Sequence, residues 1–267
     1  MKASAKLVLD EACGAMRLRD RVAIVTGGSK GIGAAISRRF AQEGAAVAIV
    51  SRSIEAGAAV VDAIRDAGGH AAAFEADCSC IADIREVVRS IVEVFGGLDI
   101  VVSNAGVHRG VPIEETTEKI WDEVLDLNLK GPFFLAQAAA PHLRRRGRGK
   151  MIFISSVAGV RAFADRPAYC AAKAGLVNLA KALAVDLARC GINVNVIAPG
   201  SVATPATAHL LEPEGQAYVQ SKRDRTPTGR AFLTAEEVAA AAVFLASDDA
   251  SAVHGDVMMV DDGWCTW

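Results

Sequence analysis

Residues 22–40, VAIVTGGSKGIGAAISRRF, contain an apolar strand, a glycine-rich turn and the start of a helix in immediate succession. The run 22–26 has the length and β-branched content of a buried strand, and residues 34–44 have helical periodicity. Glycines at such a junction let the main chain approach a pyrophosphate, whose charge the helix N-terminus stabilises. Because strand and helix supply the context that a glycine motif needs, this stretch predicts a dinucleotide-binding α/β fold.

Short apolar runs alternate with helical segments along the rest of the chain, which is typical of a parallel sheet with helices on both faces. We predict one Rossmann-type, doubly wound, seven-stranded parallel sheet, with strands at 22–26, 46–50, 71–76, 99–103, 150–155, 192–198 and 256–260. Apolar residues at helical spacing predict a buried helix face before the fourth strand: Ile84, Val87, Val88, Ile91, Val92 and Phe95. The chain therefore belongs to the α/β class.

One domain accounts for almost the whole chain. We predict a dinucleotide-binding catalytic domain over residues 18–267, preceded by an N-terminal extension over residues 1–17 that is not necessarily native to the fold. Residues 200–230 form a long connection without clear periodicity, and such loops in compact domains usually have a function. We expect this segment to close over the substrate as a lid.

The composition excludes several classes of protein. The chain is 52% hydrophobic, and its net charge of −2 predicts no general attraction to nucleic acid or an anionic membrane. No apolar run has the length of a membrane span, and the first sixteen residues lack the apolar segment of a secretory signal. The six cysteines show no metal-binding spacing, so we expect reduced, small, buried side chains, no metal site and a cytoplasmic protein.

Tyr169 and Lys173 lie four residues apart in PAYCAAKAGL (167–176), so a helix would make them neighbours on one face. An adjacent positive charge favours the phenolate and lowers the pKa of a phenol, which would make the pair a proton donor. The same spacing also fits an exposed tyrosine and a solvated lysine. The pair alone does not decide between these interpretations.

The order of motifs along the chain resembles that of the short-chain dehydrogenase/reductases, in their compact single-domain branch. The matching motifs are Gly27-x-x-x-Gly31-x-Gly33 after Thr26, Asp77 in ADCS, SNAG (103–106), Asn128 in DLNLKGPFF, ISSVAG (154–159), YCAAK (169–173) and PGSVATP (199–205). The resemblance implies an oxidoreductase that reduces a ketone to a secondary alcohol, or the reverse, by hydride transfer from a nicotinamide.

The resemblance also implies roles for four catalytic residues. Tyr169 would donate the proton. Lys173, with the oxidised nicotinamide, would lower the pKa of the phenol and hydrogen-bond the nicotinamide ribose. Ser156 would hold the substrate oxygen, and Asn128 would anchor a water that relays protons to Lys173. Ser155 is the neighbouring alternative to Ser156, but the family's thirteen-residue interval to the tyrosine favours Ser156.

The second strand indicates which cofactor is bound. An acidic residue that would hold the ribose 2′-hydroxyl of NAD is missing, because Ser51 occupies its position and Arg52 follows. Lys30 adds a second positive charge in the glycine loop, so we predict a preference for NADP(H) over NAD(H). The resemblance implies these cofactor-binding residues: Gly27, Ser29, Lys30, Gly31, Ile32, Gly33, Ser51, Arg52, Asp77, Cys78, Asn104, Ala105, Gly106, Tyr169, Lys173, Pro199, Gly200, Val202 and Thr204. For Asn104, tying adjacent strands is at least as good an explanation as contact with the cofactor.

The resemblance leaves the substrate open among 3-oxoacyl thioesters, sugars or polyols, steroids and xenobiotic ketones. Basic residues 142–150 form either a solvated surface or a docking site for an acidic acyl carrier, which Arg189 would extend. Five residues near loop ends shape the pocket or face solvent: His108, Arg109, Arg161, Phe163 and Arg166. Two other functions are conceivable: an NADP(H)-sensing protein without turnover, and a sugar-nucleotide epimerase, for which the chain after residue 200 leaves too little room.

The C-terminal segment departs from the family pattern. Asp262 occupies a position where relatives usually have glycine, and His254 one where they usually have threonine or serine. Because this segment builds a subunit contact in the family, we expect Trp264 and Trp267 to be buried against another subunit. We expect a homotetramer, with a dimer as the alternative.

Overall fold

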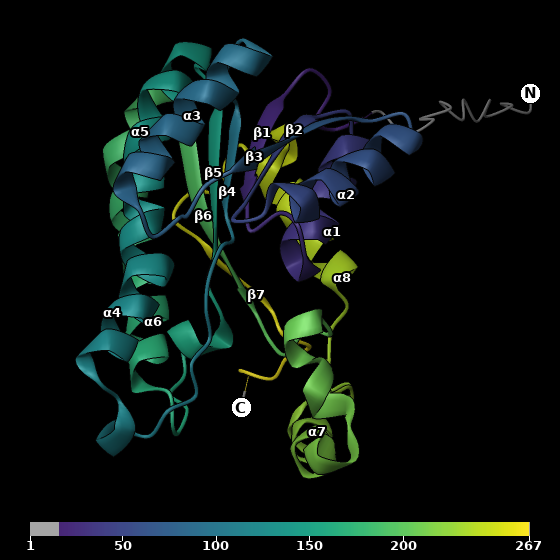
Figure 1. Cartoon of the computed structure of the whole chain (residues 1–267), viewed down its shortest axis with the longest axis vertical. Coiled ribbons are helices and arrows are strands. Elements are labelled where there is room, and N and C mark those ends of the chain that lie inside the picture. Colours follow the sequence, from purple (N-terminus) through teal and green to yellow (C-terminus); the bar gives the residue numbers. More distant parts are fainter. Residues whose placement is uncertain (1–15, 267) are drawn as a thin grey trace, which may run out of the picture.

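The computed structural model describes residues 16–266, which form one parallel sheet with helices on both faces (Figure 1). The strands are β1 (Val22–Thr26), β2 (Ala46–Ser51), β3 (His70–Glu75), β4 (Ile100–Ser103), β5 (Gly149–Ile154), β6 (Ile192–Pro199) and β7 (Val257–Val260). Their order is β3-β2-β1-β4-β5-β6-β7, and all pairs are parallel. The predicted fold class is confirmed, and each strand bound lies within one residue of the prediction.

The strand order reverses between β1 and β4, so a crevice opens there outside the carboxyl ends of the strands. This reversal arises because the chain continues from β1 to β2 and β3 on one side and then returns across the sheet to β4 on the other side of β1. The glycine loop follows β1 at this edge, and the SNAG segment follows β4. The topology therefore brings these two motifs side by side.

Two layers of helices cover the sheet. One face is packed by α1 (Gly31–Gln42), α2 (Ile54–Asp66) and α8 (Ala235–Ala246), and the other by α3 (Ile81–Phe95), α5 (Gly131–Arg146) and α6 (Pro167–Leu187). The predicted apolar stripe of α3 is buried at Ile84, Val87, Val88 and Ile91, and partly buried at Val92 and Phe95. The strands lie between these two layers of helices, so both of their faces are buried. For this reason most of their residues are apolar.

Helix α6 is long and apolar enough, by length and composition only, to cross a membrane. In the structure it packs against β6 and buries Leu176, Ala180, Ala184 and Leu187 in the core. Its apolar face is therefore explained by the sheet that it covers.

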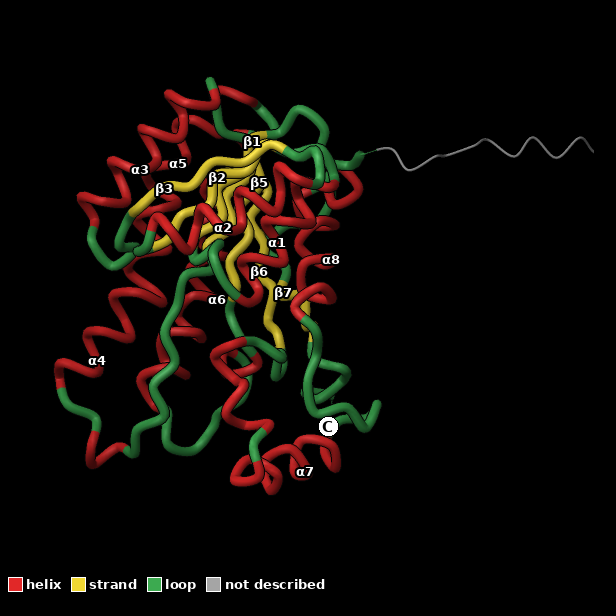
Figure 2. The backbone as a smooth tube through the Cα atoms, turned by 45° about the vertical axis from the view of Figure 1, so that its right-hand side comes forward, coloured by secondary structure: helices red, strands yellow, loops and turns green. Residues whose placement is uncertain are grey.

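The predicted lid is more regular than we expected. Residues 200–230 contain α7 (Gln216–Arg225) and two short 3₁₀ helices, Pro205–Leu211 and Pro213–Gly215. Figure 2 shows this segment beyond the carboxyl ends of the strands, while α4 (Glu118–Leu125) lies at the same end on the other side. The sequence did not predict α7, because most of its residues are polar and show little of the apolar periodicity of a packed helix.

The N-terminal boundary also needs an adjustment. Arg17, which we placed in the extension, donates hydrogen bonds from its guanidinium to the Glu43 carboxylate, and its backbone N–H also donates to Glu43. Leu18 is fully buried. The rest of the predicted extension, residues 1–15, lies outside the described residues.

The cysteines are less buried than we predicted. The five in the described part of the chain are free, and Cys80 is exposed while Cys78, Cys170, Cys190 and Cys265 are half-buried. Cys13 lies outside the described residues. Over residues 16–266, no group of three or more His, Cys, Asp or Glu side chains has the arrangement of a metal site.

The backbone at Asp262, one departure from the family pattern, explains why relatives usually have glycine at this position. Asp262 has φ of 55°, in the left-handed region that glycine adopts most easily. Arg230 Nε donates to Asp262 Oδ2 at 2.7 Å, and its Nη2 donates to Glu237 on α8 at 2.8 Å, so the carboxylate holds the turn against α8. The other departure, His254, lies on the surface.

Candidate active site

The predicted catalytic residues meet at the carboxyl end of β5. Ser156 follows this strand and begins a short 3₁₀ helix, where its Oγ accepts a hydrogen bond from Ala158 N. Tyr169 lies in the first turn of α6, and Lys173 lies one turn further along the same face. The Ser156 hydroxyl lies near enough to the Tyr169 phenol to lower its pKa. The serine and the tyrosine therefore present two hydroxyl groups to the same point.

Burial sets the protonation of Tyr169. It raises the pKa of the phenol, and the Ser156 hydroxyl and the charge of Arg166 only partly oppose this rise. Burial dominates in the protein alone, where the Lys173 ammonium lies 5.8 Å from the ring centroid. The predicted effect of Lys173 together with an oxidised nicotinamide stays a prediction. A raised pKa keeps the phenol protonated at neutral pH, as a proton donor requires.

A hydrogen bond to the backbone of β5 fixes the Lys173 side chain. Its Nζ donates to the carbonyl oxygen of Ile154 at 2.9 Å, and only 5% of the residue is exposed. Burial lowers the pKa of this ammonium to about 8. Ser155, the alternative to Ser156, donates its hydroxyl to the Lys173 carbonyl oxygen at 3.0 Å, so it ties α6 to β5.

Asn128 is fully buried in one turn of π-helix, Asp126–Lys130, between α4 and α5. Its Nδ2 donates to the carbonyl oxygens of Val107 and Val124, both at 2.9 Å, while Oδ1 has no partner. A Cβ added to Gly106 would lie 2.6 Å from Oδ1 and 3.6 Å from Lys173 Nζ. The unpartnered oxygen thus faces the lysine side of the site, and only glycine leaves that space open.

A pocket of about 400 Å³ opens over these residues. Ser156 and Tyr169 line it, together with Ile32 from the glycine loop and residues that follow β6: Pro199, Gly200, Val202 and Thr204. Its volume is in the range of small-molecule sites. The pocket therefore connects the catalytic hydroxyls to the predicted cofactor segments.

The glycine loop has the geometry of a diphosphate site. Gly27 and Gly31 have φ of 62° and 52°, which other residues adopt with strain. Lys30 precedes α1, its side chain makes no cap hydrogen bond, and no acidic residue occupies the first turn. The N-terminus of this helix is thus available to an anion. A Cβ on Gly31 would lie 3.2 Å from Thr204, so the loop and the segment after β6 approach each other.

Asn104 supports this loop from β4. Its Nδ2 donates to the carbonyl oxygens of Thr26 at 2.9 Å and Gly27 at 3.3 Å. Thr26 Oγ1 in return accepts from the N–H groups of Asn104 and Ala105. These bonds tie adjacent strands, as in the structural interpretation of Asn104.

The residues predicted to select the cofactor lie at the end of β2. Ser51 is buried, and its hydroxyl donates to the Ser53 carbonyl oxygen at 2.6 Å. Arg52 and Lys30 are exposed and form no ion pair with a carboxylate of residues 16–266. Asp77 accepts from the Ser79 N–H and hydroxyl, and these bonds and the charge of Arg52 lower its pKa.

The remaining predicted cofactor residues frame the same crevice. Ser29 is half-buried in the glycine loop, and Gly33 packs so tightly that a Cβ would lie 2.2 Å from the Gly27 carbonyl oxygen. Cys78 is half-buried, and its carbonyl oxygen packs against Gly131 at the start of α5. The chain's own residues therefore fit a dinucleotide along the carboxyl edge of the sheet.

Three of the five other predicted pocket residues line the pocket: His108, Phe163 and Arg166. His108 packs edge-on against the Tyr169 ring, with centroids 4.9 Å apart. The other two residues make contacts elsewhere. Arg109 pairs with Glu123, and Arg161 donates to the Cys265 carbonyl oxygen at 2.7 Å.

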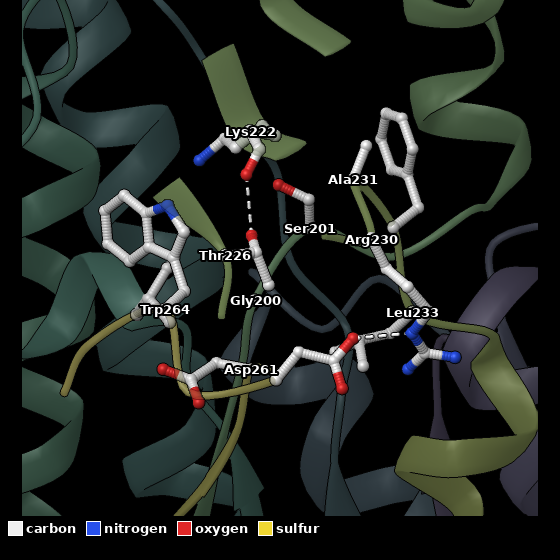
Figure 3. A pocket seen from close by; sticks show the side chains of 12 residues that line it. Gly200, Ser201, Lys222, Thr226, Arg230, Ala231, Leu233, Asp261 and Trp264 are labelled. Carbon is white, nitrogen blue, oxygen red and sulfur yellow. Dashed lines mark hydrogen bonds and ion pairs between the residues drawn. The ribbon is translucent and has the colours of Figure 1, made fainter. Parts of the chain in front are cut away.

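Sequence reasoning missed four residues near the pocket. His209, Tyr218 and Lys222 line it from the predicted lid, and Trp264 lines a smaller cavity beside it. Figure 3 shows this smaller cavity, with Lys222 and Trp264 on one side and Arg230 on the other. We expected Trp264 to be buried by another subunit, but its own chain covers it, and its ring stacks on Phe163 at 5.2 Å. Trp267 lies outside the described residues.

The basic run 142–150 lies at the other end of the sheet. It covers the end of α5 and the start of β5, whereas Ser156 follows the end of β5. Arg146 and Arg148 approach the buried Asp99 carboxylate at 3.5 and 3.8 Å, and Lys150 is itself buried. An acyl carrier docked on this run would therefore lie away from the pocket.

A Rossmann-type sheet with a serine, a tyrosine and a lysine at the mouth of its dinucleotide crevice defines a nicotinamide-dependent oxidoreductase. Residues 27–265 match a family model described as enoyl-(acyl carrier protein) reductase. The chain belongs to the short-chain dehydrogenase/reductase family, as its motifs predicted.

Curated relatives of this chain act on different substrates. A 4-formylbenzenesulfonate dehydrogenase of Comamonas testosteroni is 41% identical and aligns over 93% of this chain and 99% of its own. A galactitol 2-dehydrogenase of Agrobacterium fabrum is 38% identical, over 93% and 98% of the two chains. A solved structure from Agrobacterium tumefaciens, assigned as a 2-deoxy-D-gluconate 3-dehydrogenase with bound NADP, has a TM-score of 0.87 and 37% identity, over 95% of this chain and 100% of that one.

Proposed function

We propose that this protein is an NADP(H)-dependent oxidoreductase that reduces a ketone to a secondary alcohol, or catalyses the reverse, with Tyr169 as general acid and base. The observation that carries this proposal is that Ser156 and Tyr169 line one pocket at the mouth of the dinucleotide crevice. Bound NADPH would supply a hydride to the carbonyl carbon. The protein must then supply the proton and the hydrogen bonds to the substrate oxygen.

Negative charge develops on the substrate oxygen as the hydride arrives, and this oxygen needs donors. The Ser156 and Tyr169 hydroxyls are placed to donate to it, and Tyr169 then transfers its proton. Lys173, held at the Ile154 carbonyl oxygen, stands beside Tyr169 and favours the phenolate left behind. The unpartnered Oδ1 of Asn128 supports a proton path from the lysine side of the site.

The preference for NADP(H) is supported by Arg52 and Lys30, exposed cations beside the position where an NAD-binding protein has a carboxylate. Bound NADP in the Agrobacterium tumefaciens structure is consistent with this preference. The free cysteines of the described chain agree with a reducing, cytoplasmic environment. Relatives are named for sugar alcohols and for a 3-oxoacyl carrier substrate, so both classes belong in the first assay.

We also propose that the protein assembles as a homotetramer through the outer surfaces of α5 and α6. Phe133 on α5 and Leu183 on α6 line a shallow, mainly apolar cavity between the two helices. Phe133 is 37% exposed, and Val185, also on α6, is 79% exposed. Light scattering should give four times the 27.8 kDa chain mass. Val185→Glu should reduce that mass, and a monomeric wild-type protein would contradict the proposal.

The function is tested by following NADPH oxidation, with NADH in parallel, against a 3-oxoacyl thioester, keto sugars, a steroid ketone and small diketones. Tyr169→Phe should bind NADPH normally and lose turnover by at least about 10³-fold, because it loses its only transferable proton. Turnover retained by Tyr169→Phe would refute the mechanism. Tight NADPH binding without turnover of any ketone would favour the NADP(H)-sensing protein instead.

A further inference from the structure

The pocket above Tyr169 carries positive charge and no negative charge. Four basic side chains line it: His108, Arg166, His209 and Lys222. None of the described residues that line it is Asp or Glu. Water and protein carboxylates usually balance such a set, so its exclusively basic character at a substrate pocket requires an explanation.

Lys222 is the most buried of the four, with 9% of the residue exposed. It lies on α7, and its Nζ stands 4.4 Å from the ring centroid of Trp264 and 5.3 Å from those of Phe163 and Tyr218. These rings stabilise the ammonium from three sides through cation–π attraction. No carboxylate among residues 16–266 forms an ion pair with it.

Cation–π attraction to the aromatic rings explains why Lys222 is buried without a carboxylate. It does not explain why a second cation, Arg166, lies nearby. Arg166 is half-buried, and its Nε donates to the Ala164 carbonyl oxygen at 3.3 Å without an ion pair to any described carboxylate. It also lies over the Phe163 ring at 5.4 Å. Two cations therefore share one aromatic wall of the pocket, where they repel each other.

The titration behaviour of the wall agrees with this charge distribution. Burial lowers the pKa of Lys222, and the charges of Arg166 and Arg225 lower it further. Burial also lowers the pKa of His108, again assisted by cations, Arg166 and His209. Apart from burial, basic side chains lower these two pKa values, and only Tyr218 acts on Lys222 in the opposite direction.

A buried donor without a partner lies beside Lys222. The indole Nε1 of Trp264 makes no hydrogen bond, and it lies on the Lys222 side of the smaller cavity in Figure 3. That cavity holds only about 10 Å³, which is room for one water-sized molecule, so it holds no substrate of its own. Asp261 and Asp262 also line it, but their carboxylates already accept hydrogen bonds from Arg230 and from backbone N–H groups of the C-terminal turn. Lys222 and Ser201 line both spaces and connect them.

We propose that the substrate is a carbonyl compound with an acidic group, a carboxylate or a sulfonate, which Lys222 and Arg166 bind at the aromatic end of the pocket. The proposal rests on the proposed function, since it concerns the same pocket. An anion there would neutralise two cations that no described carboxylate balances, and it would accept charge-assisted hydrogen bonds. Phe163 and Tyr218 line the same end of the pocket, so an aromatic frame between the acid and the carbonyl suits its lining.

The cations have one other conceivable anion, the diphosphate of the cofactor. The glycine loop and Thr204 define the diphosphate end of the crevice, whereas Lys222 contacts Phe163, Tyr218 and Trp264. We therefore expect removal of the Lys222 charge to leave NADPH affinity unchanged. This expectation separates a substrate site from a cofactor site.

The test compares aromatic ketones that differ only in charge: 4-acetylbenzoate and 4-acetylbenzenesulfonate against neutral 4-acetylbenzamide. Lys222→Met keeps the contact with the rings and removes the ammonium, Lys222→Arg keeps the charge, and Lys181→Met on the exposed side of α6 is the matched control. Lys222→Met should lower kcat/KM for one or both acids by roughly 10- to 100-fold and leave that for the amide within about two-fold. Lys222→Arg and Lys181→Met should retain the preference for the acid.

An equal loss on acid and amide would overturn the proposal, because it would show that Lys222 only holds α7 in place. A wild-type preference for the amide, or weaker NADPH binding by Lys222→Met, would also overturn it. If no ketone is reduced, the proposed function fails, and binding of 4-acetylbenzoate to the NADP⁺ complex, followed by calorimetry, still tests the site. Binding that is lost in Lys222→Met alone would support it, and no binding to the wild type would overturn it.

Discussion

The Lys173 ammonium donates a hydrogen bond of 2.9 Å to the carbonyl oxygen of Ile154, the last residue of β5. This bond joins the catalytic helix α6 to the strand that precedes Ser156. The bond holds the Lys173 side chain beside Tyr169 in the protein interior. Burial there lowers the pKa of the Lys173 ammonium to about 8. The burial of Lys173 therefore affects both its position beside Tyr169 and its protonation.

This arrangement predicts opposite pH dependences for the two directions of the reaction. Reduction needs the protonated phenol, which the raised pKa of Tyr169 secures at neutral pH, and it should decline above about pH 8 as Lys173 loses its proton. Alcohol oxidation needs the phenolate and should rise with pH. Profiles of kcat/KM in both directions test this, and a reduction rate that increases with pH would contradict it.

Asn128 should contribute to both stability and turnover. Asn128→Ala leaves the carbonyl oxygens of Val107 and Val124 without their donors, so it should cost about 1–3 kcal/mol of unfolding free energy. It should also lower kcat, since Oδ1 faces the Lys173 side of the site. Asn193→Ala, which removes two similar bonds to carbonyl oxygens far from the pocket, is the control and should leave kcat unchanged. Equal kcat for both variants would refute the catalytic role.

Arg52 should determine the choice of cofactor. Arg52→Asp replaces a cation by the carboxylate of an NAD-binding strand, so it should reduce the ratio of NADPH to NADH efficiency by about 10- to 100-fold. Lys30→Ala should reduce the ratio less. Steady-state kinetics with both cofactors measure it, and Arg38→Asp on the exposed surface of α1 serves as control. An unchanged ratio in Arg52→Asp would show that the selection lies elsewhere.

Glu43 should stabilise the fold in a pH-dependent way. Hydrogen bonds from Arg17 lower its pKa from 4.5 to about 2, with a smaller contribution from Arg39. Because the pKa is lower in the folded state, the stabilisation is complete above about pH 4.5 and disappears as the pH falls towards 2.

Glu43→Gln should therefore lower the free energy of unfolding by about 1–2 kcal/mol at neutral pH, after allowance for the partly exposed Arg17. The difference from the wild type should vanish near pH 2. Urea denaturation at several pH values measures it. A constant difference at all pH values would assign the effect to packing.

Much of this protein follows from local sequence. The strands at 22–26 and 192–198 are apolar runs between turns, and a buried parallel sheet requires such runs whatever surrounds them. Residues 26–33 specify the glycine loop because the turn needs backbone angles that glycine adopts most easily. The interval from Ser156 to Tyr169 is likewise a local property, because one strand end and the next helix span it.

The basic character of the pocket is not a local property. Lys222 and Trp264 lie 42 residues apart in the sequence, and Phe163 lies a further 59 residues before Lys222, yet their side chains form one wall. No periodicity marks α7, and a terminal tryptophan looked like a subunit contact until its own chain covered it. The sequence determined the strands, the glycine loop and the spacing of the proposed catalytic residues, since short-range order produces them. Only the tertiary structure decided which charges line the pocket, because packing of the lid and the C-terminal segment brings them together.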